Sequence, residues 1–370
     1  MKLFLIAGEP SGDRLGAALM AGLRQLAPVE FHGVGGPAMQ AQGLQSLFPM
    51  AELSVMGIAE VLPRYFHLKR RMAETARAVT TLGPAALITI DSPDFCLRVA
   101  RAVRATCPGQ RNIHYVAPSV WAWRPQRAAR MALVIDHVLA LLPFEPPYMT
   151  AAGMTCDFVG HPVVAEPQAS PAERHLMDGT RPLILALPGS RRSEVTRLAP
   201  VIGQTLVALK LRHPQMRVAL PTVPHIADLV RDLSRDWPVQ PQIIADPVAK
   251  RAAFAAADVA LAASGTVSLE LAAAGTPMVI AYDMHPLTLW LTARALRIDT
   301  VTLVNLVSET RVVPEFIGAR CRADLIAPAM LDLLQHPQTQ DAAMSLTMQR
   351  LGQGGDPPGL RAARSVLAHL

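Results

Sequence analysis

The chain has 370 residues, 51% of them hydrophobic, which is typical of a folded protein with two domains rather than of a disordered chain. The four cysteines are scattered and form no CxxC pair: Cys96, Cys107, Cys156 and Cys321. We therefore expect neither a disulfide framework nor a structural zinc site, and the pattern suits a reducing cytoplasm. The net charge of +6 favours an anionic partner, but no RNA-binding or helix-turn-helix signature supports nucleic acid.

The first predicted strand, 2–7, runs into an acidic turn, Gly8-Glu9-Pro10-Ser11-Gly12-Asp13. The segment before the turn is too short for a signal peptide, and no stretch of the chain reaches the length of a membrane span. Ser11 or Asp13 could cap the helix predicted at 11–26. The acidic turn would repel a diphosphate, so we expect Glu9 and Ser11 to contact a sugar or acceptor, with simple capping as the alternative.

Short apolar runs alternate with helical patterns through the first half of the chain. The pattern predicts strands at 2–7, 29–34, 86–90, 112–117, 137–142 and 156–159, and helices at 11–26, 57–82, 95–106 and 124–134. This alternation indicates right-handed βαβ units and a parallel sheet covered on both faces.

The helix predicted at 57–82 begins with bulky apolar side chains beside a basic cluster. The apolar residues are Ile58, Val61, Leu62, Tyr65, Phe66 and Leu68, and the basic ones are Arg64, Lys69, Arg70 and Arg71. Such a helix can lie in a membrane interface. A buried amphipathic helix would show a similar pattern, so both interpretations stay open on composition alone.

Asp91-Ser92-Pro93-Asp94 follows the strand at 86–90. Asp94 precedes a helix and is expected to be its N-cap. Asp91 lies at the strand end, where a carboxylate could take a proton from an acceptor hydroxyl as general base. The alternative is that Asp91 accepts backbone N–H bonds in the turn.

The stretch 114–127 holds two of the four tryptophans, Trp121 and Trp123, together with Arg124 and Arg127, which suit a phosphate. Flat indoles suit packing on sugar faces or acyl chains, whereas core packing is the more usual fate of tryptophan. His114 and His161 lack partners at metal-ligand spacing, and we interpret both as structural or hydrogen-bonding residues.

Residues 163–181 lose periodicity and read as a linker, after which alternation restarts. Strands are predicted at 183–187, 217–221, 242–245, 259–263 and 277–282. The chain is therefore expected to form two Rossmann-like α/β domains facing a cleft, at 1–165 and 182–320, followed by a helical tail at 321–370. Ligands of open parallel sheets bind beyond the carboxyl ends of the strands, so the cleft is the predicted site.

Two turns of the second domain look like a cradle for a nucleoside diphosphate. Pro188-Gly189-Ser190-Arg191 follows one strand, and Ser264-Gly265-Thr266 follows another, with Glu270 four residues after Thr266. Small residues let the backbone approach a phosphate, helix N-termini offer N–H groups, and Arg191 adds a fork of donors. Glu270 is suited to ribose hydroxyls. An ordinary turn capped by Ser264, with Glu270 on a solvated face, is the alternative.

Together these motifs resemble the lipid-A-disaccharide synthases, a family of bacterial glycosyltransferases. The resemblance rests on GEPSGD at 8–13, Val55-Met56-Gly57-Ile58, Asp91 to Phe95, HYVAPSVWAWRPQR at 114–127, Leu142 to Glu145, Phe158 to Pro162, PGSR, and SGT with Glu270. It covers nearly the whole chain.

The resemblance implies a GT-B fold and an inverting hexosyltransferase of lipid A, and hence lipopolysaccharide, biosynthesis in a Gram-negative bacterium. UDP-2,3-diacylglucosamine would donate its sugar to 2,3-diacylglucosamine 1-phosphate, giving a β-1,6-linked disaccharide and UDP without a metal or other cofactor. By the same resemblance, Asp91 is the catalytic carboxylate, and Asn305 joins the UDP-binding residues Gly189, Ser190, Arg191, Ser264, Gly265, Thr266 and Glu270.

Acylated glucosamine substrates also favour the membrane interpretation of the helix at 57–82. We then expect a cytoplasmic protein, peripheral on the anionic inner face of the inner membrane, with a homodimer left open. Rival interpretations are another UDP-sugar enzyme, such as a 2-epimerase or a peptidoglycan glycosyltransferase, and an idle nucleotide-sugar sensor. The sensor, unlike an enzyme, would lose nothing on Asp91→Asn.

Overall fold

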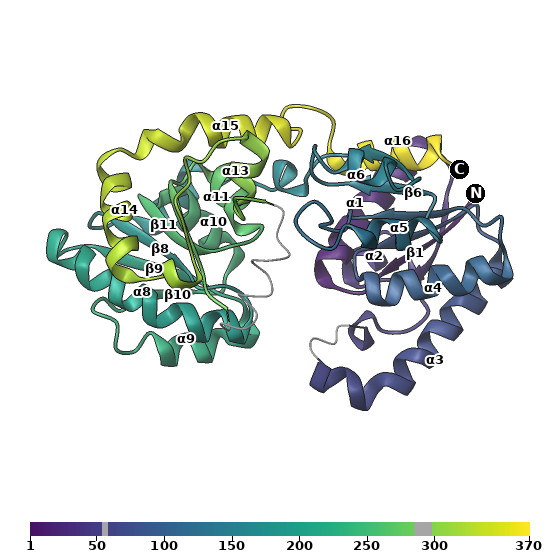
Figure 1. Ribbon diagram of the computed structural model, residues 1–370, viewed down its shortest axis with the longest axis horizontal. Helices are drawn as coiled ribbons and strands as arrows, with labels where there is room; N and C mark the ends of the chain where they lie inside the picture. The colour runs from purple at the N-terminus through teal and green to yellow at the C-terminus, as the bar shows by residue number, and fades with distance from the viewer. Residues whose placement is uncertain (54–57, 285–297) are drawn as a thin grey trace. The chain divides into compact units, whose positions relative to one another are not determined.

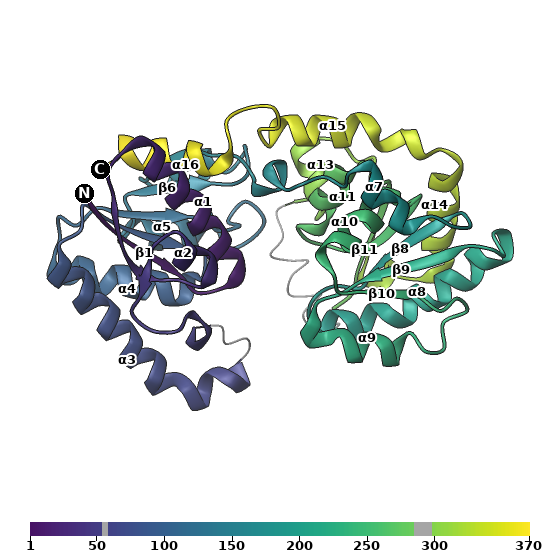
Figure 2. The same ribbon diagram turned by 180° about the vertical axis from the view of Figure 1, so that it is seen from behind.

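The computed structural model of the protein describes residues 1–53, 58–284 and 298–370, and the chain divides into two compact units. The first unit comprises Met1–Ala165 and Gly354–Leu370, and the second comprises Glu166–Gln353. Each unit is a parallel sheet with helices on both faces (Figures 1 and 2). The near-continuous apolar strands explain this arrangement, since a parallel sheet buries both faces.

The first unit carries a seven-stranded sheet in the order β3-β2-β1-β4-β5-β6-β7. Its strands are β1 (Lys2–Ala7), β2 (Glu30–Val34), β3 (Gln45–Ser46), β4 (Ala86–Ile90), β5 (Asn112–Tyr115), β6 (His137–Ala140) and β7 (Thr155–Phe158). Its helices are α1 (Pro10–Leu26), α2 (Pro37–Ala41), α3 (Ile58–Leu82), α4 (Pro93–Thr106), α5 (Gln126–Ala132), α6 (Pro146–Thr150) and α16 (Pro358–Ala368).

The second unit carries a six-stranded sheet in the order β10-β9-β8-β11-β12-β13. Its strands are β8 (Leu183–Leu187), β9 (Arg217–Pro221), β10 (Gln242–Ile244), β11 (Val259–Ala263), β12 (Met278–Tyr282) and β13 (Glu315–Ile317). Its helices are α7 (Pro171–Arg174), α8 (Arg192–Arg212), α9 (Ala227–Leu233), α10 (Pro247–Ala256), α11 (Val267–Ala274), α13 (Leu303–Ser308), α14 (Ala323–Gln335) and α15 (Asp341–Arg350).

Every predicted strand is present, with small differences at the ends. The strand predicted at 112–117 ends at Tyr115, because Val116 has a φ of 85° and leaves the extended conformation. The linker predicted at 163–181 contains the short helix α7. Ser170 and Glu173 cap that helix reciprocally, a local signal that proline-based reasoning overlooked.

The last helix does not remain with the rest of the predicted tail. Helices α14 and α15 belong to the second unit, whereas α16 packs on α1 of the first (Figure 1). A Cβ atom on Gly22 would lie 2.6 Å from the carbonyl oxygen of Gly359, and one on Gly359 would lie 2.5 Å from that of Ala18. The two helix backbones therefore approach through glycines, which explains why this end of the chain returns to the first unit.

Candidate functional site

The predicted site residues lie where the chain order of each sheet reverses. In the first sheet this switch point falls between β1 and β4, and in the second between β8 and β11. The turns after these four strands begin at Gly8, Asp91, Pro188 and Ser264. Since ligands of doubly wound sheets bind at the carboxyl ends of the strands beside the switch point, the topology groups the predicted residues into two strand-end sites, one in each unit.

The turn after β4 has a strained backbone. Asp91 and Ser92 have φ values of 52° and 43°, a left-handed conformation that costs non-glycine residues roughly 1–2 kcal/mol each. The N–H of Asp91 donates to the carbonyl of Tyr115, at 2.9 Å, which fixes the turn to β5. The Asp91 side chain is half-buried, and its carboxylate accepts no backbone hydrogen bond from the described residues of the turn. The strained turn therefore presents a carboxylate at the strand end.

The two turns of this first site are packed together. A Cβ atom on Gly8 would lie 2.6 Å from Oγ of Ser92, so only glycine lets the β1 turn approach the strained residue. Glu9 is half-buried at the N-cap position of α1, and Ser11 is exposed in its first turn. The structure thus places Glu9 and Ser11 beside the Asp91 turn, while their contact with a ligand stays a prediction.

Two predicted helix caps are wrong. No side chain caps α1 or α4, and the N-cap residue of α4 is Ser92 rather than Asp94, which is exposed at the second position of the helix. Asp13 instead reaches across to α2, where its carboxylate accepts from the backbone N–H groups of Gly36, Ala38 and Met39 at 2.9–3.0 Å. Its role is therefore to cap α2, a long-range contact that local spacing does not reveal.

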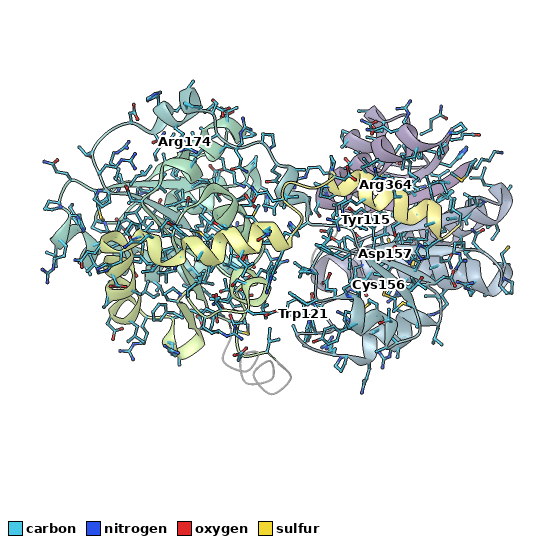
Figure 3. All side chains as sticks on the ribbon, turned by 90° about the horizontal axis from the view of Figure 1, so that it is seen from above. Tyr115, Trp121, Cys156, Asp157, Arg174 and Arg364 are labelled. Atoms are coloured by element: carbon cyan, nitrogen blue, oxygen red, sulfur yellow. The ribbon has the colours of Figure 1, made fainter. Side chains whose placement is uncertain are left out.

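Trp121 (labelled in Figure 3) lies in the loop after β5, and its side chain contacts the loop after β6. Its indole N–H donates to the Glu145 carboxylate at 3.2 Å, and its ring meets Phe144 edge-to-face with centroids 5.1 Å apart. The backbone is again left-handed at Val116 and Arg124, on either side of Trp121. The Trp121 ring is half-buried and its N–H is hydrogen-bonded, so Trp121 is neither a fully buried core residue nor a freely exposed one.

Glu145 is a functional candidate to which the sequence analysis gave no role, although it belongs to the motif at Leu142 to Glu145. It is 4% exposed and also accepts from the backbone N–H groups of Leu141 and Leu142, at 3.2 and 3.0 Å. Burial raises the pKa of this carboxyl to about 7, although the three N–H donors oppose the shift. A buried acid with a near-neutral pKa next to a strand-end loop is a common feature of functional sites.

His114 and His161 are buried, as their structural interpretation requires. Nδ1 of His114 pairs with the Thr89 hydroxyl at 2.7 Å, and Nδ1 of His161 accepts from the N–H of Val163 at 3.2 Å. Burial lowers the pKa of each imidazole to about 4. Both rings are therefore neutral parts of the fold at physiological pH.

The turn after β8 forms the first half of the second site. Gly189 has a φ of 110°, which suits glycine, and Ser190 and Arg191 are exposed at the start of α8. The backbone N–H groups of Ser190 and Arg191 and the Arg191 guanidinium all point to one place, where they contact the carboxylate of Glu194. We call this set of converging donors the anion cradle, and its contact with a diphosphate stays a prediction.

The turn after β11 forms the second half. Gly265 has a φ of 150° and is exposed, and Thr266 is the N-cap residue of α11. Ser264 does not cap the helix, since its hydroxyl donates to the Val301 carbonyl. Glu270 is half-buried and forms an ion pair with Lys250, Nζ to Oε2, at 2.6 Å. Lys250, on α10, is a neighbour of this site that motif reasoning missed.

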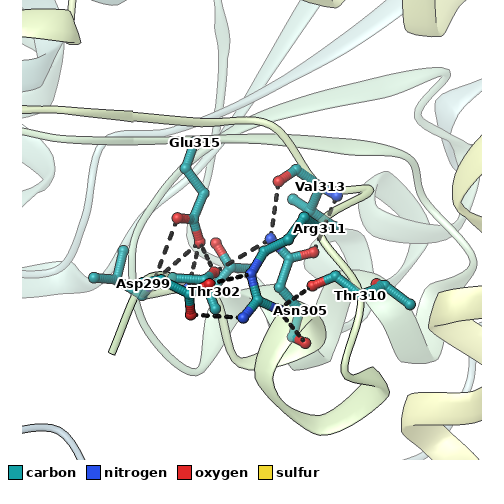
Figure 4. A network of polar contacts seen from close by, with 9 residues as sticks. Asp299, Thr302, Asn305, Thr310, Arg311, Val313 and Glu315 are labelled. Carbon is teal, nitrogen blue, oxygen red and sulfur yellow. Dashed lines mark hydrogen bonds and ion pairs between the residues drawn. The ribbon is translucent and has the colours of Figure 1, made fainter. Parts of the chain in front are cut away.

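Asn305, on α13, belongs to a network of polar contacts with the segments on either side of that helix (Figure 4). It is 1% exposed, its amide nitrogen donates to the carbonyl of Val313 and to the Thr300 hydroxyl, and its oxygen accepts from the N–H of Val313. Glu315 and the Arg311–Asp299 ion pair complete the network. In this structure the Asn305 side chain supports the loop, and its contact with a nucleotide stays a prediction.

The segment predicted to dock on a membrane lies at the start of α3. The side chains of Ile58, Val61, Leu62 and Tyr65 are outside the described residues. Phe66 is 81% exposed, and Leu68 is half-buried. Arg71 is bound to Glu52 and Glu74 and so serves the fold. Among the described residues, none of the helices is both long and apolar enough to cross a bilayer.

One histidine-rich cluster lies outside both sites, where α16 meets β6 and β7 (Figure 3). His137 bonds to the hydroxyls of Thr155 and Ser365 through its two ring nitrogens, at 2.8 Å each. Its ring stacks on His369 at 3.7 Å, and Ser365 donates to Asp157 at 2.6 Å. Both nitrogens of His137 are bonded to hydroxyls in this structure, and these bonds attach α16 to the sheet. The ligand atoms of His137, Asp157 and His369 also lie within 4.8 Å of one another, close enough for the three residues to hold a metal ion.

Comparison with known proteins decides between the candidate families. A sequence model described as lipid-A-disaccharide synthetase matches residues 3–357. A lipid-A-disaccharide synthase from Ruegeria pomeroyi is 63% identical, over 100% of this chain and 96% of its own length. The chain belongs to the lipid-A-disaccharide synthase family. A second relative of that name, from Rhodospirillum centenum, is 48% identical over 99% of the chain and 94% of its own length.

Solved structures of low identity share the fold. A UDP-GlcNAc 2-epimerase from Neisseria meningitidis bound to UDP-GlcNAc superposes with a TM-score of 0.67 at 11% identity, covering 100% of this chain and 98% of its own. MurG from Acinetobacter baumannii superposes with a TM-score of 0.56 at 14% identity, covering 100% and 99%. These matches confirm the two Rossmann-like domains of a GT-B fold, and the family match favours the glycosyltransferase over the epimerase.

Proposed function

We propose that the protein joins UDP-2,3-diacylglucosamine to 2,3-diacylglucosamine 1-phosphate, forming the β-1,6-linked disaccharide and UDP. The observation that carries this proposal is topological. In each sheet the motif residues of the family follow the two strands that flank the switch point. If these motifs were only ordinary turns, we would not expect them to follow the two switch-point strands in both sheets.

The second unit is assigned the donor. The Gly189–Arg191 turn supplies backbone N–H groups and a guanidinium for the diphosphate, and Glu270 supplies a carboxylate for the ribose hydroxyls. Positive charge at this turn would stabilise the UDP that leaves when the bond between the anomeric carbon and the phosphate oxygen breaks.

The first unit is assigned the acceptor. Asp91 is the proposed base, because the strained turn holds its carboxylate at the strand end rather than in backbone bonds. As the acceptor hydroxyl oxygen attacks the anomeric carbon from the face opposite the diphosphate, Asp91 takes the hydroxyl proton and the configuration inverts. Glu9, Ser11 and Trp121 are the proposed contacts of the sugars.

An assay of disaccharide synthesis in detergent tests the reaction. Purified protein receives both acylated glucosamine substrates with EDTA and no added metal. We expect UDP release together with the tetraacyl disaccharide, since a guanidinium and helix N–H groups can carry the diphosphate charge without a metal. A requirement for added metal would contradict the cofactor part of the proposal. Failure to form product, while UDP binds, would contradict the reaction itself.

Membrane docking through the start of α3 is the corresponding proposal for location. The exposed Phe66 and the exposed cations Lys69 and Arg70 support it, because apolar and basic groups together bind anionic lipid surfaces. On this proposal the protein lies on the anionic cytoplasmic face of the inner membrane. We expect a smaller fraction of the Phe66→Ser variant than of the original protein to sediment with vesicles that contain about 30% phosphatidylglycerol. Leu176→Ser, a control at another exposed apolar residue, should sediment like the original protein.

A further inference from the structure

The anion cradle of the second unit holds the chain's own carboxylate. Oε2 of Glu194 accepts from the backbone N–H groups of Ser190 and Arg191, at 3.2 and 3.3 Å. Oε1 of the same residue accepts from the Arg191 guanidinium at 3.1 Å. All three donors that the proposed function gives to the donor diphosphate are therefore bound to one internal anion.

The turn is shaped around this carboxylate. A Cβ atom on Gly189 would lie 2.5 Å from Oε2 of Glu194, so any larger residue would collide with it. The Glu194 side chain is 12% exposed, whereas Arg191 is 65% exposed. Glu194 thus lies on the inner side of the cradle, and the guanidinium covers it from the solvent.

The charge of Glu194 also reaches the neighbouring strand end. Burial raises the pKa of Tyr282, at the end of β12; Glu194 adds to this rise, and Arg191 opposes it. His225 contacts the same turn from another side, pairing through Nε2 with the carbonyl of Ser190 at 3.2 Å. Of these neighbours, Arg191 is the group that holds Glu194 in place by opposite charge.

We propose that Glu194 is an internal competitor of the nucleoside diphosphate: it fills the cradle of the ligand-free protein and leaves when UDP or the UDP-sugar binds. This inference rests on the proposed donor site. Two anions cannot share the same donors, because both would lose their solvation and repel each other. The bonds that Glu194 must break are long, and its guanidinium partner is exposed, so displacement is inexpensive.

The competition has a role in turnover. Tight binding of the diphosphate would favour the donor complex but would also retain the product UDP after transfer. When UDP leaves, Glu194 returns to the N–H groups, which restores their hydrogen bonds and prevents bare donors from capturing other phosphates. Glu194 thereby weakens UDP binding in exchange for faster release.

Equilibrium binding of UDP and of uridine to Glu194→Gln tests the proposal. The amide keeps an oxygen that can cap the N–H groups but carries no charge. We expect UDP to bind about tenfold more tightly than to the original protein, equivalent to ~1.4 kcal/mol. Uridine has no phosphate, and its affinity should not change.

Glu173→Gln is the matched control. Glu173 occupies the same N3 position of a capped helix in the same unit and also pairs with an arginine, Arg251, but lies at α7 rather than at the cradle. It should leave UDP affinity unchanged. Melting temperatures show whether either variant is misfolded, and Glu194→Asp, whose shorter side chain draws the charge back, should give a smaller gain in UDP affinity.

The outcomes separate this inference from the proposed function. If the unsubstituted protein binds no UDP, the donor site itself is refuted. If it binds UDP, and Glu194→Gln binds it equally or more weakly, then Glu194 supports the cradle instead of competing for it, and the inference is overturned. A parallel gain for uridine would overturn it as well, because the effect would not depend on phosphate.

Discussion

The two strand-end sites solve the same geometric problem with different residues. In the first unit, the loops leave their strands through left-handed residues that have side chains, namely Asp91, Ser92, Val116 and Arg124. In the second, the corresponding turns use Gly189 and Gly265. Side chains in that conformation store strain but present functional groups in fixed positions, whereas glycines leave room for a ligand to approach the backbone. On the proposed function, the backbone of the first site would orient an acceptor and that of the second would admit a phosphate.

The largest effect should come from Asp91→Asn. Asparagine tolerates the left-handed conformation, so the turn should fold while the base is lost. We expect turnover to fall by roughly 10²–10⁴-fold, with UDP affinity unchanged because UDP is assigned to the other unit. Rates and UDP titrations on the same preparation check this. Equal loss of both would show that Asp91 shapes the whole protein rather than the acceptor step.

Trp121 and Glu145 test whether orientation in the first site depends on the loop bond. Trp121→Phe removes the N–H but keeps the ring against Phe144, and Glu145→Gln places an amide opposite the indole. Each should raise the KM of the acceptor by about fivefold, near the energy of one hydrogen bond. The double variant should be no worse than either single one. Additive losses would mean that the two residues act separately.

Acid should weaken the first unit through its buried histidines. Burial lowers the pKa of His114, His137 and His161 from 6.5 to about 4. Their contribution to stability is therefore present above pH 6.5 and is lost as the pH falls toward 4, because the unfolded chain binds protons first. Glu145 has the opposite effect on stability. Its pKa is raised to about 7, so the folded protein binds this proton before the unfolded chain does, and acid stabilises the fold at this residue.

The three histidines destabilise the fold as the pH falls, and Glu145 alone opposes them. The free energy of unfolding should therefore fall on the order of 2 kcal/mol per pH unit between pH 6 and 5. Amide hydrogen exchange resolves this by unit, and the first unit should lose protection before the second. His114→Gln should reduce the slope. A slope that this variant leaves unchanged would place the acid sensitivity elsewhere.

The smallest effects should come from replacing a left-handed serine of the first site by glycine and a left-handed glycine of the second site by alanine. Ser92→Gly relieves a left-handed residue and should raise the free energy of unfolding by about 1 kcal/mol, at some cost in turnover as the Asp91 turn loosens. Gly265→Ala has open space for its methyl group but the wrong φ, and should lower that free energy by about 1–2 kcal/mol. Urea unfolding of both variants measures these changes in the free energy of unfolding. If both variants change it in the same direction, the contrast between the two sites is refuted.

Sequence reasoning predicted the sheets well because a buried parallel strand carries its own signal. Runs such as Leu183–Leu187 are apolar throughout and end in turn residues. The edge strands β3 and β13, of two and three residues, were not predicted, since so short a segment has no periodicity to read. Boundaries shifted where one residue such as Val116 left the extended conformation.

Motifs singled out the candidate site residues, whose ligand contacts stay predictions, but motifs did not reveal the internal partners of these residues. Asp13 caps a helix 23 or more residues away, and Lys250 reaches Glu270 from another helix. Pairings of this kind depend on tertiary structure and leave no spacing signature. The Glu194 contact was within reach, because a glutamate three residues after the N-cap position is a recognised capping signal.

The return of α16 to the first unit has a consequence for how the protein is made. The first unit consists of Met1–Ala165 and Gly354–Leu370, and the face of α1 that carries Ala18 and Gly22 is covered by that final segment. During synthesis the first unit must therefore wait, with this face uncovered, until the entire second unit has been translated. The second unit, whose residues are contiguous, can mature first, so the order of folding should reverse the order of the chain.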